Sequence, residues 1–399
     1  MAMERHADQS PPCELAPVNP GWVLLFLPLL VHLWHLLQWH AGLRGIWAEE
    51  TDEPTAPADP GQPLDLTVVL PVRNEAHTLT RLLSDLAAQS LQPAEVIVID
   101  DASEDGTVAA AKAAGPFPFP LRVIDNPGRG KKPGLSAGIR AANTEWAVGI
   151  DADARIGPDA LWAMSNVLCQ RGNAMDMALL PLRIARTTKG PPKEELTRLQ
   201  SLDFAAMQGW AVAAVRRGHP AMASGGGWVW RCDAFPHNGL RPDIPSGDDV
   251  FSLATLIERG DAARVGWIDD RRAMVSAGPM DTLSTLLDQR IRWGAKSTRY
   301  PQSLREARRV AWTVAALHAA GLALLVIAPV AGLLFWGVKS AADMAYTARV
   351  GRMYGLLPQS PMAALGSLFL LAVTHPVFVA TTLLVMPLRT GRWKGRPAG

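Results

Sequence analysis

Three stretches of the chain are rich in hydrophobic residues and contain no formal charge. They cover residues 22–39, about 310–338 and about 363–387. A helix needs roughly 20 apolar residues to cross a bilayer core, so each stretch predicts a membrane-spanning segment rather than a buried core helix. The second contains Pro329, which is compatible with one long tilted helix or with a tight re-entrant pair. For the first, the polar lead and the lack of a small-residue cleavage site favour an anchor over a signal peptide.

Basic residues flank these stretches mainly on one side. They follow the first stretch, precede the second and follow the third: Arg44, Arg305, Arg308, Arg309, Arg389, Arg392, Lys394 and Arg396. The positive-inside rule then predicts that residues 41–309 and the C-terminal tail lie in the cytoplasm. Lys339, Arg349 and Arg352, between the second and third stretches, argue in the other direction and are compatible with a loop at the membrane interface.

Between residues 64 and 300 the pattern changes to short apolar runs that alternate with helical patterns. The runs are rich in Val and Ile, as expected for strands buried on both faces. Such alternation predicts an α/β domain with a mostly parallel sheet and helices on both sides. The expected strands lie at 67–70, 95–99, 121–124 and 147–150, and the expected helices at about 77–90, 105–114 and 133–142.

These patterns divide the chain into a soluble domain between membrane segments. The linker contains the run PTAPADPGQP at 54–63, which is rich in proline. The expected order is a polar tail over 1–20, an anchor over 21–40, a linker over 41–63, the soluble domain over 64–300, spans over 310–338 and 363–388 joined by a loop over 339–362, and a basic tail over 389–399.

Composition agrees with a chain that is partly embedded in lipid. Hydrophobic residues make up 48% of the chain and charged residues 19%, whereas soluble domains carry about a quarter charged residues. The net charge of +2 argues against a protein that binds nucleic acid through a basic face. The cysteines (Cys13, Cys169 and Cys232) are widely spaced without a CxxC pair, which argues against a disulfide framework or a structural zinc site.

Carboxylates follow three of the expected strands. Asp100 and Asp101 follow the second strand, Asp151 and Asp153 follow the fourth, and Glu75 comes shortly after the first. Ligands of such sheets bind beyond the carboxyl ends of the strands, and like charges gathered there repel unless a cation or ligand compensates them. Two carboxylates at Asp-x-Asp spacing suit Mg²⁺ or Mn²⁺. The alternatives are a helix N-cap for Asp100-Asp101 and a structural loop pair for Asp151 and Asp153.

Three further motifs carry candidate binding groups. The run GRGKKPG at 128–134 precedes a helix and fits either an anionic diphosphate or a solvated basic loop. It does not match a P-loop, and no GxGxxG follows the first strand. Asp248 and Asp249 open an amphipathic helix, where one of them is also a natural cap. Gln289, Arg292 and Trp293 share one helix face, which suits contact with a sugar, base and phosphate or packing against the core.

Taken in order, the motifs Pro-x-x-Asn-Glu, Asp-Asp-x-Ser, Asp-x-Asp, Gly-Asp-Asp and Gln-x-x-Arg-Trp resemble the family 2 glycosyltransferases. That family has a GT-A nucleotide-sugar-binding fold. The resemblance covers about residues 64–300. The N-terminal anchor and the paired C-terminal segments are similar to those of ceramide glucosyltransferases and bacterial hopanoid-associated glycosyltransferases.

The resemblance implies a site for a nucleotide-sugar donor. Pro71, Arg73 and Glu75 would line the nucleoside pocket, and Asp101 or Asp100 would bind the base. Lys132, or its neighbour Lys131, would approach the diphosphate, and Asp151 would contact the sugar or ribose.

The same resemblance implies the metal and catalytic groups. Asp153, with Asp151, would hold a divalent Mg²⁺ or Mn²⁺ ion. Asp249 matches the general base, although the family more often has Glu-Asp where this chain has Asp248-Asp249, which leaves the choice between the two open. The Gln289, Arg292 and Trp293 motif would engage the diphosphate and the acceptor.

The expected function is therefore inverting, metal-dependent sugar transfer to a hydroxyl of a lipid or lipid-linked acceptor at the cytoplasmic membrane face. A processive polysaccharide synthase has the same motifs, but three spans are few for a secretion channel. A non-catalytic membrane scaffold with this fold is the alternative from another class, and the full set of carboxylates argues against it. A transporter is disfavoured because the uncharged spans offer no ionisable pathway beyond a few histidines.

Overall fold

The computed structural model describes residues 20–47, 64–171, 174–185, 194–241, 243–244, 246–297, 299–386, 392–393 and 396–397. The expected polar tail up to residue 19, the linker from 48 to 63 and most of the basic tail, with Arg389 and Lys394, lie outside the described residues. So does Cys13.

A seven-stranded sheet forms the centre of the domain, in the order β3-β2-β1-β4-β8-β6-β9. The four expected strands are confirmed as the parallel strands β1 (Leu66–Val72), β2 (Glu95–Asp100), β3 (Leu121–Asp125) and β4 (Trp146–Ile150). The rest of the sheet consists of β6 (Met177–Leu179), β8 (Gly227–Arg231) and β9 (Val265–Trp267), with β8 antiparallel to both neighbours. The sheet is mostly parallel, as predicted.

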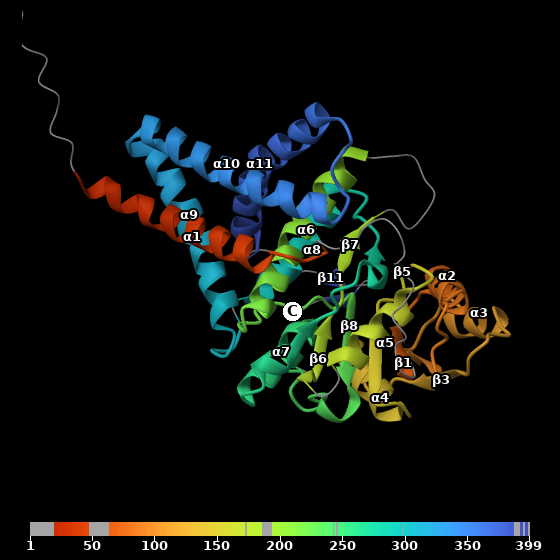
Figure 1. Cartoon of the computed structure of the whole chain (residues 1–399). Coiled ribbons are helices and arrows are strands. Elements are labelled where there is room, and N and C mark those ends of the chain that lie inside the picture. The colour runs from red at the N-terminus through yellow and green to blue at the C-terminus, as the bar shows by residue number, and fades with distance from the viewer. Residues whose placement is uncertain are drawn as a thin grey trace, which may run out of the picture.

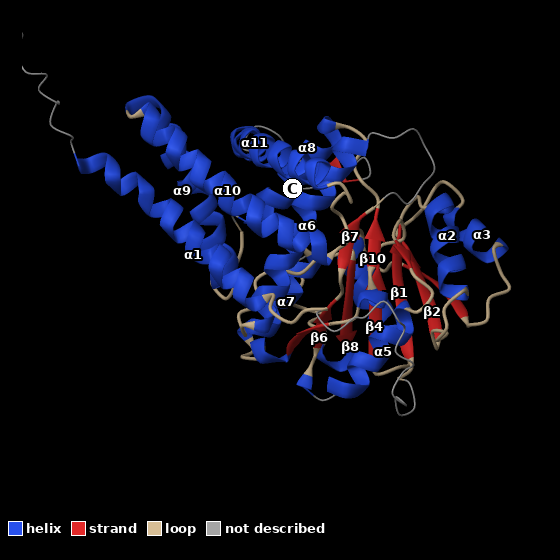
Figure 2. Ribbon diagram, turned by 45° about the horizontal axis from the view of Figure 1, so that its top comes forward, coloured by secondary structure: helices blue, strands red, loops and turns tan. Residues whose placement is uncertain are grey.

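Helices cover both faces of the sheet because successive side chains of each strand point to opposite sides. On β1, Val69 packs in a core with α4 (Lys131–Ala141), whereas Val68 and Leu70 pack in a second core with α2 (Ala76–Ala87) and α5 (Ala160–Arg171). The short α3 (Thr107–Ala113) packs beside α2. Figure 2 shows β1, β2, β4 and β8 side by side, with helices along the sheet. The three expected helices are thus confirmed.

A second, three-stranded sheet extends the domain beyond the carboxyl ends of the main strands. It joins β5 (Arg155–Ile156), β10 (Val275–Ala277) and β7 (Leu182–Ile184). Helices α6 (Glu194–Arg216), α7 (Asp248–Glu258) and α8 (Leu283–Ser297) complete the domain. Together these elements build walls around the edge of the main sheet where the acidic motifs lie.

Long helices lie beside the sheet domain (Figure 1). These are α1 (Leu27–Gly42), which continues a 3-10 turn over Pro20–Phe26, and α9 (Arg305–Ile327), α10 (Pro329–Met353) and α11 (Pro361–Val385). Among the described residues, the segments Gly21–Gly42, Arg305–Ile327 and Pro361–Val385 are long and apolar enough to cross a membrane. The three predicted hydrophobic stretches are therefore helical.

The region after the second stretch differs from the prediction. The stretch from 310 to 338 is divided between α9 and α10, which meet at Ala328 and Pro329, since proline lacks the N–H that would continue a helix and is favoured in a first turn. The expected loop over 339–362 is helical as far as Met353. Its charges are compensated inside the helix bundle, because Asp343 lies 2.8 Å from Lys339 and 2.7 Å from Nε2 of His32 on α1.

Candidate active site

A cavity of about 760 Å³ opens beyond the carboxyl ends of β1 and β4. The walls come from the loops after these strands and from α6, α7, α8 and α11. All but two of the predicted site residues line it: Pro71, Arg73, Glu75, Asp101, Lys131, Asp151, Asp153, Asp248, Asp249, Gln289, Arg292 and Trp293. The fold thus gathers motifs that are spread over more than half of the chain.

The two exceptions, Asp100 and Lys132, have structural contacts. The Asp100 carboxylate accepts a hydrogen bond from the backbone N–H of Ser103, 3.2 Å away. The Lys132 ammonium donates to the carbonyls of Arg241 and Ile244, at 2.8 and 2.6 Å, and so fixes the loop that precedes α7. Burial lowers the pKa of Lys132 to about 8. The structure therefore favours Asp101 over Asp100, and Lys131 over Lys132, as the donor-site residues.

Lys131 is the cation at the centre of the acidic cluster. Its Nζ lies 2.6 Å from Asp151 Oδ1, 3.5 Å from Asp248 Oδ2 and 2.7 Å from the carbonyl oxygen of Gly225. Burial alone would lower the pKa of Lys131, but the Asp151 and Asp248 carboxylates outweigh it and raise that pKa. A Cβ at Gly225 would lie 3.3 Å from Nζ, so a larger residue at position 225 would press on the end of the Lys131 side chain.

Asp153 and Asp151 form the pair that fits a metal ion. Partial desolvation within the cavity, with the nearby Asp151 charge, raises the pKa of Asp153 to about 6. Two carboxylates that repel each other in this way are suited to a hard divalent cation. Among the described residues, no group of three or more His, Cys, Asp and Glu side chains could hold a metal ion. The remaining ligands of a cation at this pair would therefore be water and substrate oxygens.

Asp248 and Asp249 begin α7 in different environments. Asp248 is the partner of Lys131, and burial raises its pKa. Asp249 is 9% exposed, and its Oδ1 accepts a hydrogen bond from the Val250 N–H at 2.8 Å. The same oxygen lies 3.8 Å from the Nζ of Lys296 on α8. A backbone donor and a cation thus hold one oxygen of Asp249, at the edge of the cavity.

The Gln-x-x-Arg-Trp motif lies on α8 and is held by a buried ion pair. Arg290, inside the motif, pairs with Asp203 of α6, and its guanidinium lies 4.4 Å from the centre of the Trp293 ring. Asp203 is also 3.4 Å from Nε2 of His375 on α11. Burial would raise the pKa of Asp203, but the Arg290 charge, with His375, brings it to about 2. This network joins α6, α8 and α11 at the cavity wall.

Comparison with known proteins identifies the domain. Residues 67–234 match the model of glycosyl transferase family 2. The chain carries a family 2 glycosyltransferase domain. The resemblance predicted from the motif order is thereby confirmed.

Relatives of the glycosyltransferase domain match over about 100 residues. The chain is 36% identical over 100 residues to the succinoglycan biosynthesis protein ExoO of Rhizobium meliloti, covering 25% of this chain and 28% of the relative. It is 31% identical over 101 residues to the undecaprenyl-phosphate 4-deoxy-4-formamido-L-arabinose transferase of Serratia proteamaculans, covering 24% and 31%. It is 31% identical over 102 residues to a poly-beta-1,6-N-acetyl-D-glucosamine synthase of Staphylococcus aureus, covering 25% and 24%. The match spans less than a third of each relative.

A solved structure shows the same fold over most of the chain. The mannosyltransferase PcManGT from Pyrobaculum calidifontis, in complex with GDP-Man and Mn²⁺, superposes with a TM-score of 0.50 at 18% identity. The likeness covers 90% of this chain and 96% of that chain. The predicted GT-A fold is confirmed.

Sequence reasoning missed part of the wall of the glycosyltransferase cavity. Lys296 is four residues after Arg292 on α8, and helical spacing alone could have placed it on the motif's face. Asp203 and the lining face of α11 had no local signal. That face consists of His375, Phe378, Val379, Thr382 and Leu383.

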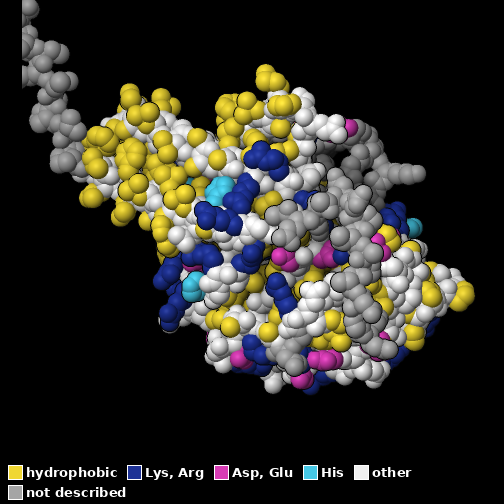
Figure 3. Space-filling view, in the orientation of Figure 1, with side chains coloured by type: hydrophobic (Ala, Val, Ile, Leu, Met, Phe, Trp, Pro, Cys, Tyr) yellow, Lys and Arg dark blue, Asp and Glu magenta, His cyan; other side chains and the backbone are white. Residues whose placement is uncertain are grey.

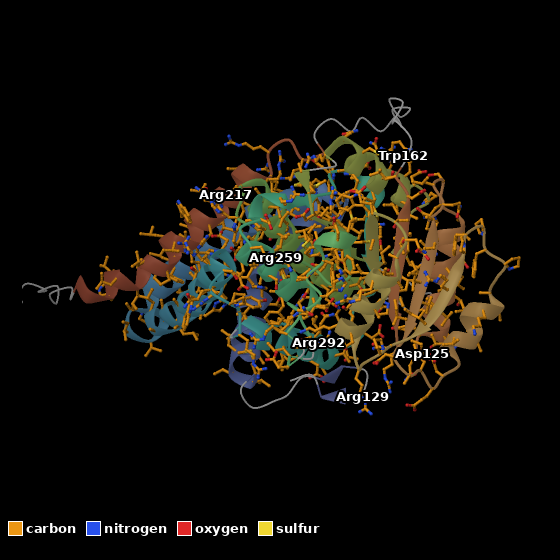
Figure 4. All side chains as sticks on the ribbon, turned by 90° about the horizontal axis from the view of Figure 1, so that it is seen from below. Asp125, Arg129, Trp162, Arg217, Arg259 and Arg292 are labelled. Carbon is orange, nitrogen blue, oxygen red and sulfur yellow. The ribbon has the colours of Figure 1, made fainter. Side chains whose placement is uncertain are left out.

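Figure 4 shows the side chains of the molecule seen from below. Arg129 and Arg292, which both line the cavity, lie in the same lower part of this view, whereas Trp162 lies at the opposite edge. Arg129 belongs to the glycine-rich loop and Arg292 to α8. These two guanidinium groups, one from the glycine-rich loop and one from α8, thus add to Lys131 in offering positive charge to an anionic ligand.

Proposed function

We propose that the protein is an inverting, metal-dependent glycosyltransferase that moves a sugar from a nucleotide-sugar donor to a hydroxyl of a lipid or lipid-linked acceptor. The cytoplasmic face of a membrane is the proposed location, in keeping with the basic residues at the ends of the apolar helices. The observation that carries the proposal is the cavity itself. One wall bears the acidic strand ends, and another is a face of α11, a candidate membrane span.

The donor end of the cavity is assigned to the strand loops. Pro71, Arg73, Glu75 and Asp101 surround the space for the nucleoside, and Asp151 contacts the sugar or ribose. Lys131 offsets the negative charge that grows on the leaving diphosphate. A divalent cation bound at Asp153 and Asp151 would supply further positive charge to the same diphosphate. The PcManGT structure, of the same fold, contains GDP-Man and Mn²⁺, which supports this assignment.

The transfer itself needs one base and one displacement. Asp249 accepts the proton of the acceptor hydroxyl, whose oxygen bonds to the anomeric carbon. The bond between that carbon and the diphosphate breaks, and the electron pair leaves with the nucleoside diphosphate. Because the attack comes from the face opposite the leaving group, an α-linked donor gives a β-glycoside. Gln289, Arg292 and Trp293 orient the diphosphate and the acceptor from α8.

A lipid acceptor is favoured by the apolar side chains that α11 brings to the cavity. The undecaprenyl-phosphate transferase among the relatives, by its name, also uses a lipid carrier. The poly-beta-1,6-N-acetyl-D-glucosamine synthase favours the second candidate, processive synthesis of a polysaccharide. The deciding experiment incubates the detergent-solubilised chain with a panel of nucleotide sugars, Mg²⁺ or Mn²⁺ and membrane lipid extract. A lipid bearing a single sugar supports the proposal, whereas a ladder of polymer supports the synthase.

Metal removal is expected to abolish transfer. With excess EDTA, nucleoside diphosphate release should fall to the no-enzyme background, and added Mn²⁺ or Mg²⁺ should restore it, because without the cation the Asp151 and Asp153 carboxylates repel the negative diphosphate. Asp153→Asn should remain inactive after the metal is returned, while Asp159→Asn, at a carboxylate outside the cavity, should recover fully. Unchanged activity in EDTA would contradict metal dependence.

Filling the α11 wall is expected to block the acceptor selectively. Val379→Trp places an indole in the cavity, so transfer to lipid should fall by at least about tenfold while slow donor hydrolysis to water persists. Val377→Trp is the matched control, since Val377 is 66% exposed on the same helix and does not line the cavity. Equal loss of transfer and hydrolysis in Val379→Trp, or equal effects of the two variants, would place the acceptor elsewhere.

A further inference from the structure

A second hollow, separate from the catalytic cavity, lies between α1 and the start of α9. Its volume is about 800 Å³. Its lining includes Trp34 and His35 on α1 and Arg305, Arg308, Arg309 and Trp312 on α9. It shares no lining residue with the catalytic cavity. We call it the α1–α9 groove.

The groove carries positive charge that the protein does not neutralise. Within the described part of the chain, no carboxylate pairs with Arg305, Arg308 or Arg309, and their side chains make no hydrogen bond. The nearest acid on this turn is Glu306, whose side chain is 11% exposed and lies 3.9 Å from Nδ1 of His35. Three guanidinium groups therefore face one inward-turned carboxylate. Guanidinium is the side-chain group best matched to phosphate oxygens.

A buried histidine also lines the groove. His35 is 2% exposed, and its Nδ1 lies 3.9 Å from the Glu306 carboxylate. The only acid of this turn is therefore directed at the histidine and away from the three arginines, which leaves their positive charge to a ligand from outside the protein.

The surroundings of the groove indicate which kind of anion binds. Trp34 and Trp312 are 49% and 72% exposed at its rim, as is typical of side chains at a membrane interface. From the rim, exposed apolar side chains continue along both helices: Leu27 and Leu30 on α1, and Leu322 and Val326 on α9. The two helices pack together in this direction, since Leu29 of α1 shares a core with Leu317 and Leu324 of α9. An apolar surface thus extends from the arginines along both α1 and α9.

Figure 3 shows the same division on one face of the molecule. Hydrophobic side chains cover the long helices, and Lys and Arg side chains gather where these helices meet the domain. An ammonium or guanidinium cluster at that border attracts anionic lipid headgroups.

We propose that the α1–α9 groove binds the phosphodiester headgroup of an anionic phospholipid, with the acyl chains lying along the apolar faces of α1 and α9. The phosphate contacts Arg305, Arg308 and Arg309 at the start of α9. This site is distinct from the acceptor site of the proposed transferase, and the inference does not depend on the sugar transferred.

Binding is tested by thermal unfolding of the full chain in a neutral detergent. Dioleoylphosphatidylglycerol should raise the melting temperature more than the zwitterionic dioleoylphosphatidylcholine does, and added salt should reduce the difference. Inorganic phosphate and glycerol 3-phosphate, which carry the anion without acyl chains, should have no comparable effect. Equal shifts with the two lipids, or an equal shift with free phosphate, would overturn the proposal. These measurements use the unmodified protein.

A charge variant locates the binding. The triple variant Arg305→Gln/Arg308→Gln/Arg309→Gln is expected to bind phosphatidylglycerol about 100-fold more weakly. Each arginine is expected to contribute a factor of about ten or less to the affinity. The control Arg81→Gln/Arg140→Gln/Arg171→Gln removes the same charge from exposed positions of the sheet domain and should bind like the unmodified chain. Equal loss in both variants would show a general charge effect and overturn the assignment to the groove. Donor hydrolysis by each variant, measured in parallel, reports on folding and on the transferase proposal separately.

Discussion

Asp249→Asn is expected to lower the turnover of sugar transfer by about 10²- to 10⁴-fold, the usual contribution of a positioned general base. The amide keeps the size of the carboxylate, and its oxygen still accepts the hydrogen bond that Val250 N–H gives to Asp249 Oδ1. What the variant loses is the ability to take a proton. Turnover should therefore collapse while the affinity for the nucleotide-sugar donor, measured by calorimetry, changes little.

Two further variants make this prediction decisive. Asp243→Asn removes an exposed carboxylate shortly before α7, with 57% of its side chain exposed, and should leave turnover unchanged. Asp248→Asn removes the partner of Lys131 and should weaken donor binding more than turnover. If Asp248→Asn instead loses turnover while Asp249→Asn retains it, the base is Asp248, and the assignment to Asp249 is wrong.

The strands and helices of the sheet domain could be predicted because their signals are local. β1, β2 and β4 are short runs of mainly buried apolar residues, β3 is a partly buried edge strand, and α2 places Leu79, Leu82, Leu83 and Leu86 on one buried face. The sequence predicts a loop for the part of α10 after residue 338, because Lys339 and Asp343 interrupt the apolar pattern. Asp343 also pairs with His32, which depends on a contact between α10 and α1 that no local pattern contains.

The site also has features that local signals predict and features that they do not. Motif residues at strand ends meet because parallel strands end at one edge, so the clustering of Asp101, Asp151 and Asp153 follows from the sheet alone. The choice between Lys131 and Lys132 depends on which side chain the first turn of α4 directs into the cavity, and the repeated lysines give no sign of it. The pairing of Asp203 with Arg290 and His375 joins three helices from separate parts of the chain. A single sequence has no pattern that reports such a contact.

That network supports the second large prediction, which concerns stability. Asp203→Ala is expected to lower the free energy of unfolding by about 3–5 kcal/mol, because it leaves the Arg290 guanidinium buried without its counter-charge. The Asp203 and Arg290 side chains are 17% and 12% exposed. For a domain of this size the loss corresponds to a fall in melting temperature of about 10 °C. Asp243→Ala breaks the exposed pair with Arg241, whose side chains are 57% and 49% exposed, and should cost less than about 1 kcal/mol.

The double variant Asp203→Leu/Arg290→Met separates charge compensation from positioning. If the single variant is unstable because a charge is left unpaired, replacing both groups by apolar ones should restore most of the melting temperature. Transfer activity should nevertheless stay low, because the guanidinium that lies 4.4 Å from the Trp293 ring is gone. A double variant as unstable as Asp203→Ala would contradict charge compensation. A double variant with full activity would show that the role of Trp293 does not depend on Arg290. The pair joins α8 to α6 and, through His375, to α11. Its loss should therefore weaken acceptor binding more than donor binding.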